Sequence, residues 1–256
     1  MKPYYVVEFN ASACLFEIRV NDIPVMILDN SGQASSIAPV NFAILDSGIQ
    51  KLDVGVFPHS GETVLDANAS MSYKVKLYDV SYGFEFKHDL LAYKFPATDP
   101  RKQVPYSRKS DQFDAQIPYE LEGWRKGVHL KGVEDVELKL KRAYARLAQS
   151  INAKRYDQFE QALANREHIM ATSMYLNKHE SARRISNLVK DFEDGFELMP
   201  LASDAVFHYY ADGKMAAFKR LNGEPAMFLQ NQEKQEELSL DLLFYIPEGK
   251  TEFEVI

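Results

Sequence analysis

Residues 132–151 read GVEDVELKLKRAYARLAQSI, and the change of pattern at the start of this stretch decides how the chain folds. From Val133 to Ile151 the apolar side chains recur every three or four residues, as on the buried face of an α-helix. Before Gly132 the apolar residues alternate with polar ones, which is the period of a β-strand. We therefore predict that an all-β segment ends near Gly132 and that helices follow it.

The segment 1–131 is predicted to be an antiparallel β-sandwich. Leu52, Val54 and Val56 alternate cleanly after Gly48, and the pair Asn21-Asp22 separates two apolar runs, as in a hairpin turn. A polar, proline-rich loop is expected at 96–111. Short strands without a crossover helix favour an antiparallel sandwich. In this pattern the segment resembles accessory β-sandwich domains.

The segment 132–256 is predicted to be an α+β domain, with helices at about 133–196 and strands at about 198–256. Three apolar stripes of helical period precede a hairpin at Asp212-Gly213, a dipeptide that suits a type I′ turn. This order of elements resembles the NTF2-like and cystatin-like architectures over 133–256. The resemblance implies a cone of sheet and helices that can hold a ligand, and it would place His208 and Tyr210 on its inner face.

Composition excludes several classes of function. The chain of 256 residues has a formal net charge of −7, which argues against a general nucleic-acid binder because phosphate binding needs clustered Lys and Arg. Cys14 is the only cysteine, so no intramolecular disulfide can form. We find no signal-peptide pattern and no apolar stretch long enough for a membrane helix, and we expect a cytoplasmic protein without a membrane partner.

The sequence contains no recognisable constellation for catalysis, a cofactor or a metal. Phosphate-binding glycine motifs and the G-x-S-x-G pattern of hydrolases are absent. Histidines never stand three or four residues apart, so no metal site is expected. Trp124, between Gly123 and Arg125, suits a sugar-stacking platform, an interface anchor or a plug between the two halves, and we favour the plug.

These observations favour binding over chemistry. We expect a non-enzymatic interaction protein that recognises a protein partner, a role compatible with a bacterial immunity-type or accessory protein. One alternative is a small-molecule-binding or catalytic cone in the C-terminal half. Another is a carbohydrate-binding β-sandwich, which an exposed aromatic pair would favour. The candidate ligand-binding residues are Trp124, His208 and Tyr210, with no catalytic or metal-ligating residue and no cofactor expected.

Overall fold

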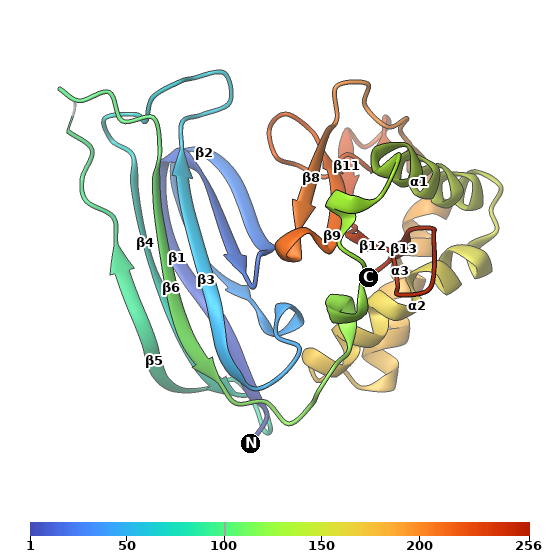
Figure 1. Ribbon diagram of the computed structural model, residues 1–256, viewed down its shortest axis with the longest axis horizontal. Coiled ribbons are helices and arrows are strands. Elements are labelled where there is room, and N and C mark those ends of the chain that lie inside the picture. Colours follow the sequence, from blue (N-terminus) through green and yellow to red (C-terminus); the bar gives the residue numbers. More distant parts are fainter. Residues whose placement is uncertain (100) are drawn as a thin grey trace. The chain divides into compact units, whose positions relative to one another are not determined.

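The computed structural model describes residues 1–99 and 101–256, and the chain divides into two compact units, Met1–Leu121 and Glu122–Ile256 (Figure 1). Residues 122–131 belong to the second unit because their backbone pairs with its C-terminal segment. The Val128 amide donates to the Ile246 carbonyl, and Gly127 forms a bridge with Pro247. The independent domains expected at 1–131 and 132–256 stay a prediction.

The first unit is an antiparallel sheet, so the all-β prediction for the N-terminal half is confirmed. Its strands are β1 (Pro3–Val20), β2 (Ile23–Pro39), β3 (Gly48–Phe57), β4 (Ser70–Asp79), β5 (Glu85–Lys94) and β6 (Ser107–Ala115). They follow the order β5-β4-β1-β3-β6, and β2 also pairs with β1. A 3-10 turn at Asn41–Ala43 precedes β3.

Strand β1 joins two groups of strands. From Val6 to Val20 it pairs with β2. It also pairs with β4 as far as Ser12, and with β3 from Leu15 onward. Because β4 and β3 take different halves of β1, the strands form one continuous hydrogen-bonded sheet instead of two separate ones. Strands β4 and β6, which belong to different halves of this sheet, approach each other in the core. There the Tyr73 hydroxyl of β4 donates a 2.7 Å hydrogen bond to the Asp111 carboxylate of β6.

A β-bulge at Ala13 keeps one face of β1 turned to the core. The register with β2 shifts at this residue, whose backbone has a left-handed φ of 50°. Before the bulge, Phe9 and Ala11 are buried; after it, Cys14 and Phe16 are buried. One extra residue moves the alternation from odd to even positions, and the apolar side chains therefore stay inside.

Two strands are longer than their apolar patterns predict. Strand β2 continues through the polar residues 29–36 to Pro39, because its backbone pairs with β1 along that length. Strand β6 begins at Ser107, inside the loop expected at 96–111. That loop also contains Pro100, which lies outside the described residues.

The second unit is α+β, as predicted, with three helices followed by its strands (Figure 1). The helices are α1 (Val136–Asn152), α2 (Tyr156–Ser173) and α3 (Lys178–Glu193). The strands are β7 (Glu197–Leu198), β8 (Val206–Tyr210), β9 (Met215–Lys219), β10 (Phe228–Asn231), β11 (Glu236–Ser239), β12 (Phe244–Tyr245) and β13 (Glu254–Val255).

The apolar stripes of the helices form the core of this unit. On α1, Leu140, Tyr144 and Leu147 are buried at helical spacing. Helix α3 begins with a capping box, in which the Asn177 side chain accepts from backbone amides and Glu180 accepts from the Asn177 amide. The buried apolar stripe of α1 and the capping box of α3 thus both follow from local sequence.

The strands of the second unit form two small sheets, where the cone-like resemblance implies one curved sheet. Their orders are β11-β10-β7 and β13-β12-β9-β8. The segment Leu238–Ile246 is divided between β11 and β12, which belong to different sheets. Phe159, Phe218 and Phe244 lie in the core cluster between these elements. The interior is thus filled by aromatic and aliphatic side chains.

Candidate binding sites

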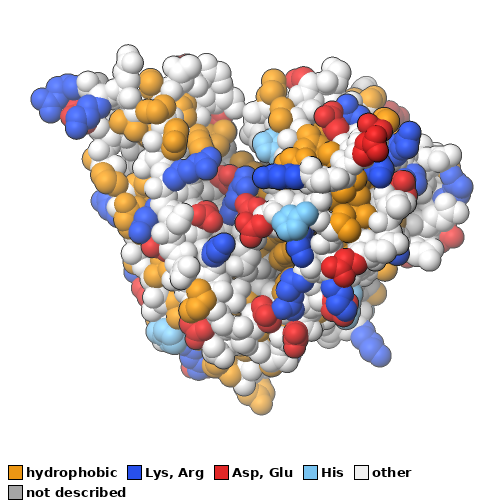
Figure 2. All heavy atoms as spheres, viewed as in Figure 1, with side chains coloured by type: hydrophobic (Ala, Val, Ile, Leu, Met, Phe, Trp, Pro, Cys, Tyr) orange, Lys and Arg blue, Asp and Glu red, His pale blue; other side chains and the backbone are white. Residues whose placement is uncertain are grey.

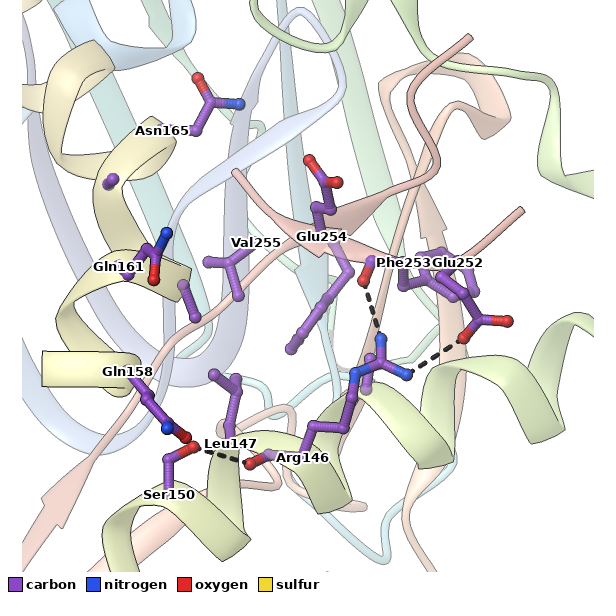
Figure 3. A pocket seen from close by; sticks show the side chains of 14 residues that line it. Arg146, Leu147, Ser150, Gln158, Gln161, Asn165, Glu252, Phe253, Glu254 and Val255 are labelled. Carbon is purple, nitrogen blue, oxygen red and sulfur yellow. Dashed lines mark hydrogen bonds and ion pairs between the residues drawn. The ribbon is translucent and has the colours of Figure 1, made fainter. Parts of the chain in front are cut away.

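A pocket of about 710 Å³ lies in the second unit between α1, α2 and β13 (Figure 3). Its floor is apolar and includes the buried side chains of Leu147, Phe253 and Val255. Its wall carries six planar polar side chains, which are Arg146, Gln158, Gln161, Asn165, Glu252 and Glu254. A volume of this size and an apolar floor with a few polar groups are typical of small-molecule sites.

Helical and strand periods place these polar side chains together. Gln158, Gln161 and Asn165 are three and four residues apart, so they share one face of α2, which borders the pocket in Figure 3. At the C-terminus of the chain, Phe253 is buried and Glu254 is more exposed, as the alternation of an extended segment requires.

Hydrogen bonds fix the two ends of the wall. The Arg146 guanidinium donates to the Glu252 carboxylate and to the Phe253 carbonyl, each at 3.0 Å (Figure 3). The Asn165 Nδ2 donates to the Tyr245 hydroxyl at 3.1 Å. Glu254 forms an ion pair with Lys250. The charged groups around the pocket are therefore paired within the chain.

Two carboxylates, those of Glu252 and Glu254, line the pocket, and each is paired with a basic side chain. Ser150 supplies its only lining hydroxyl, and that hydroxyl donates to the Arg146 carbonyl at 3.2 Å, one helical turn earlier. Among the described residues that line it, none is a histidine or a cysteine. Within residues 1–99 and 101–256, no group of three His, Cys, Asp or Glu side chains is placed to hold a metal ion.

The three residues singled out from the sequence lie elsewhere. Trp124 is 8% exposed in a 3-10 turn at Gly123–Lys126. His208 and Tyr210 share one face of β8, with ring centroids 6.2 Å apart, and Tyr210 is buried. None of them lines the pocket between α1, α2 and β13. Their role in ligand binding stays a prediction.

Sequence reasoning missed the pocket because its wall comes from segments about a hundred residues apart. Arg146 lies on α1 and its partner Glu252 lies near the C-terminus. The only local signal is the helical spacing of Gln158, Gln161 and Asn165, and polar residues on one helix face ordinarily indicate contact with water.

A second candidate site is an aromatic surface at the hairpin between β4 and β5 in the first unit. Tyr82 is fully exposed, and Phe84 and Phe86 are 53% and 50% exposed. The Phe84 ring stacks on Tyr78 with centroids 4.2 Å apart and also contacts Tyr4 at 5.7 Å. We call these five residues the aromatic edge. Contiguous exposed apolar side chains are uncommon on a solvated surface, which makes the aromatic edge a candidate interaction site.

Strand β5 presents a free backbone edge next to these rings. It stands last in the sheet, and in the described part of the chain it pairs only with β4. Residues 85–89 are exposed on both faces of the strand. Glu85 pairs with Lys87 at 2.8 Å, and Lys76 pairs with Glu8 at 2.6 Å. The surroundings of the aromatic edge thus combine both signs of charge.

Charges are also mixed over the wider surface. On the face drawn in Figure 2, Lys and Arg side chains are interspersed with Asp and Glu side chains, without a continuous basic area. Phosphate-backbone binding needs such an area. Helices that could span a bilayer are not found in residues 1–99 and 101–256.

Comparison with known proteins adds no relative. No protein-family model matches this chain, and no curated protein or solved structure is significantly similar to it. Its function therefore has to be inferred from the geometry of the two candidate sites.

Proposed function

We propose that this chain is a non-enzymatic binding protein that recognises a protein partner through the aromatic edge. The observation that supports this proposal is the coincidence of exposed Tyr82, Phe84 and Phe86 with the unpaired edge of the ten-residue strand β5. Large aromatic side chains dominate the binding free energy of protein interfaces. A bacterial immunity-type or accessory role is one form that such recognition takes.

The partner segment that fits this site is an extended strand. The free edge of β5 offers backbone donors and acceptors that an added strand satisfies, while alternate side chains supply specificity. Glu85, Lys87 and Asp89 alternate with the other residues of β5. Charged side chains on an edge strand oppose pairing between identical chains. We therefore expect a different protein, and not a second copy, to occupy the edge.

The test compares the full chain with a variant that removes the exposed rings. The triple variant Tyr82→Ser/Phe84→Ser/Phe86→Ser is expected to lose a partner that the unmodified chain captures after chemical cross-linking. Ile49→Ser is the matched control, because Ile49 is an apolar residue of the same unit and is 64% exposed. Circular dichroism verifies that both variants fold.

The outcomes separate binding from other functions. A captured protein that binds the unmodified chain and Ile49→Ser, and whose purified form binds the triple variant at least about tenfold more weakly, supports the proposal. Equal binding to all three proteins would contradict it. Catalytic turnover in a substrate screen without any partner would also contradict it.

The two alternatives have different support in the structure. Small-molecule binding by the second unit is supported by the pocket between α1, α2 and β13, and not by the filled interior near His208 and Tyr210. Carbohydrate binding by the first unit has the exposed aromatic rings it requires. However, Tyr78 and Phe84 stack on each other, and this covers one face of each ring. We therefore rank protein recognition first for the aromatic edge.

A further inference from the structure

We infer that the pocket between α1, α2 and β13 binds a neutral ligand rich in hydroxyl groups, of the saccharide class. The pocket lies wholly in the second unit and the aromatic edge lies in the first. The inference is thus independent of the proposed recognition of a protein partner, and each can fail without the other.

The charge of the pocket favours a neutral ligand. Arg146 is paired with Glu252, and Glu254 is paired with Lys250. An anionic ligand would meet two carboxylates and an arginine that is already neutralised. A cationic ligand would have to displace Arg146 or Lys250 from its partner. Neither exchange gains an ion pair, because every new pair replaces an existing one.

The unused hydrogen-bonding capacity of the wall matches hydroxyl groups. Within the part of the chain that the structure describes, the side chains of Gln158 and Gln161 make no hydrogen bond, and both line the pocket. The bond from Asn165 Nδ2 to the Tyr245 hydroxyl leaves its Oδ1 to accept. Side-chain amides donate and accept, as hydroxyls do, so neighbouring hydroxyls can each find a partner.

The floor and the length of the pocket match a short oligosaccharide. Ala162 and Ala164 line the pocket and are exposed, so their methyl groups offer an apolar surface for the C–H groups of a sugar ring. The row from Gln158 to Asn165 covers seven residues of helix, or about 10 Å. The small side chain of Ala162, which also lines the pocket, leaves space between these amides. A purely apolar ligand would bury the amides without partners, at a cost in binding free energy.

The experiment titrates the full chain with neutral mono-, di- and trisaccharides of glucose, galactose, mannose and N-acetylglucosamine by isothermal calorimetry. Two variants alter the pocket: Gln158→Ala/Gln161→Ala removes the free amides, and Ala162→Phe fills the space between them. Gln158, Gln161 and Ala162 are exposed, so neither change disturbs the core. The matched control is Gln149→Ala, an exposed glutamine of α1 that does not line the pocket.

We expect at least one saccharide to bind the unmodified chain and Gln149→Ala alike. Loss of both amides should weaken that binding about 25-fold, since each hydrogen bond contributes roughly a factor of five. Ala162→Phe should abolish it. Absence of binding by every saccharide would overturn the inference, and so would equal binding by the pocket variants. Binding of an unstructured peptide library in place of saccharides would overturn it as well.

Discussion

Glu167 of α2 holds a partly buried ion network together, and its removal should destabilise the second unit. Its carboxylate accepts from Arg166 at 2.5 Å and from Arg184 of α3 at 2.8 Å. The Glu167 side chain is 11% exposed, compared with 28% for Arg166 and 35% for Arg184. Burial, together with the like charge of Arg184, lowers the pKa of Arg166. We predict that Glu167→Gln lowers the free energy of unfolding by about 3 kcal/mol.

The magnitude follows from what the arginines can do once the carboxylate is gone. Removal of one partner from a fully buried ion pair costs about 3 to 5 kcal/mol, because the other charge stays without compensation. Arg166 and Arg184 are about a third exposed and can turn towards water, which places the cost at the lower end. Glutamine keeps the size of the side chain, so no cavity contributes.

Trp124 makes the measurement specific to this unit. It is the only tryptophan of the chain, it is 8% exposed, and it belongs to the second unit. Urea unfolding followed by its fluorescence should show a midpoint lower by about 1.5 M, with a slope of about 2 kcal/mol/M. Glu160→Gln is the control, since Glu160 is an exposed residue of the same helix with no ion pair in the described part of the chain.

The result that would refute this reasoning is a midpoint for Glu167→Gln no lower than that for Glu160→Gln. A double variant, Glu167→Gln/Arg184→Gln, tests the cause. If an uncompensated charge is responsible, the loss of Arg184 should recover part of the stability, and the two effects should not add. Additive losses would indicate that the network acts only through packing.

Three further predictions concern the first unit. Burial raises the pKa of the Cys14 thiol to about 11, so at pH 7.5 it should react with iodoacetamide only after unfolding, and mass spectrometry of the native chain should show no adduct. Hydrogen bonds from Ser81 and from the Lys2 amide lower the pKa of Asp79 to about 2 from 3.8. The stability that Asp79 contributes is therefore present above about pH 4 and lost as the pH falls through about 2; an NMR titration with a midpoint near 3.8 would contradict this. Ala13→Gly should stabilise the unit by about 0.5 to 1 kcal/mol, because glycine adopts the left-handed φ of 50° without strain. Thermal unfolding followed by circular dichroism should then show a higher midpoint temperature.

Much of the architecture could be predicted from local pattern. The three helices follow from apolar stripes, since a helix buries one face every three or four residues. The turn at Asn21-Asp22 has left-handed φ values of 52° and 61°, as a tight hairpin requires. The hairpin of β8 and β9 lies where the Asp212-Gly213 turn predicts it. In each case neighbours in sequence carry the whole signal.

Pairing between distant segments was decided only in the folded chain. The sequence of β2 after Leu28 is largely polar and lacks the apolar alternation of a strand, yet its backbone pairs with β1 as far as Pro39. Strand β1 is shared between β3 and β4 because the bulge at Ala13 redirects it, and no residue type marks that bulge. Hydrogen bonds between backbones do not depend on side-chain identity, so the sequence pattern does not reveal them.

The sequence by itself determined the fold class of each half, the helices and most hairpins, because the period of apolar residues is a local property. Only the tertiary structure decided where the candidate binding sites lie. The pocket wall takes Arg146 and Glu252 from opposite ends of the second unit. The aromatic edge becomes a candidate because β5 pairs with β4 alone among the described residues. Which surfaces stay exposed depends on how all the elements pack, so it cannot be predicted from any one segment of the sequence.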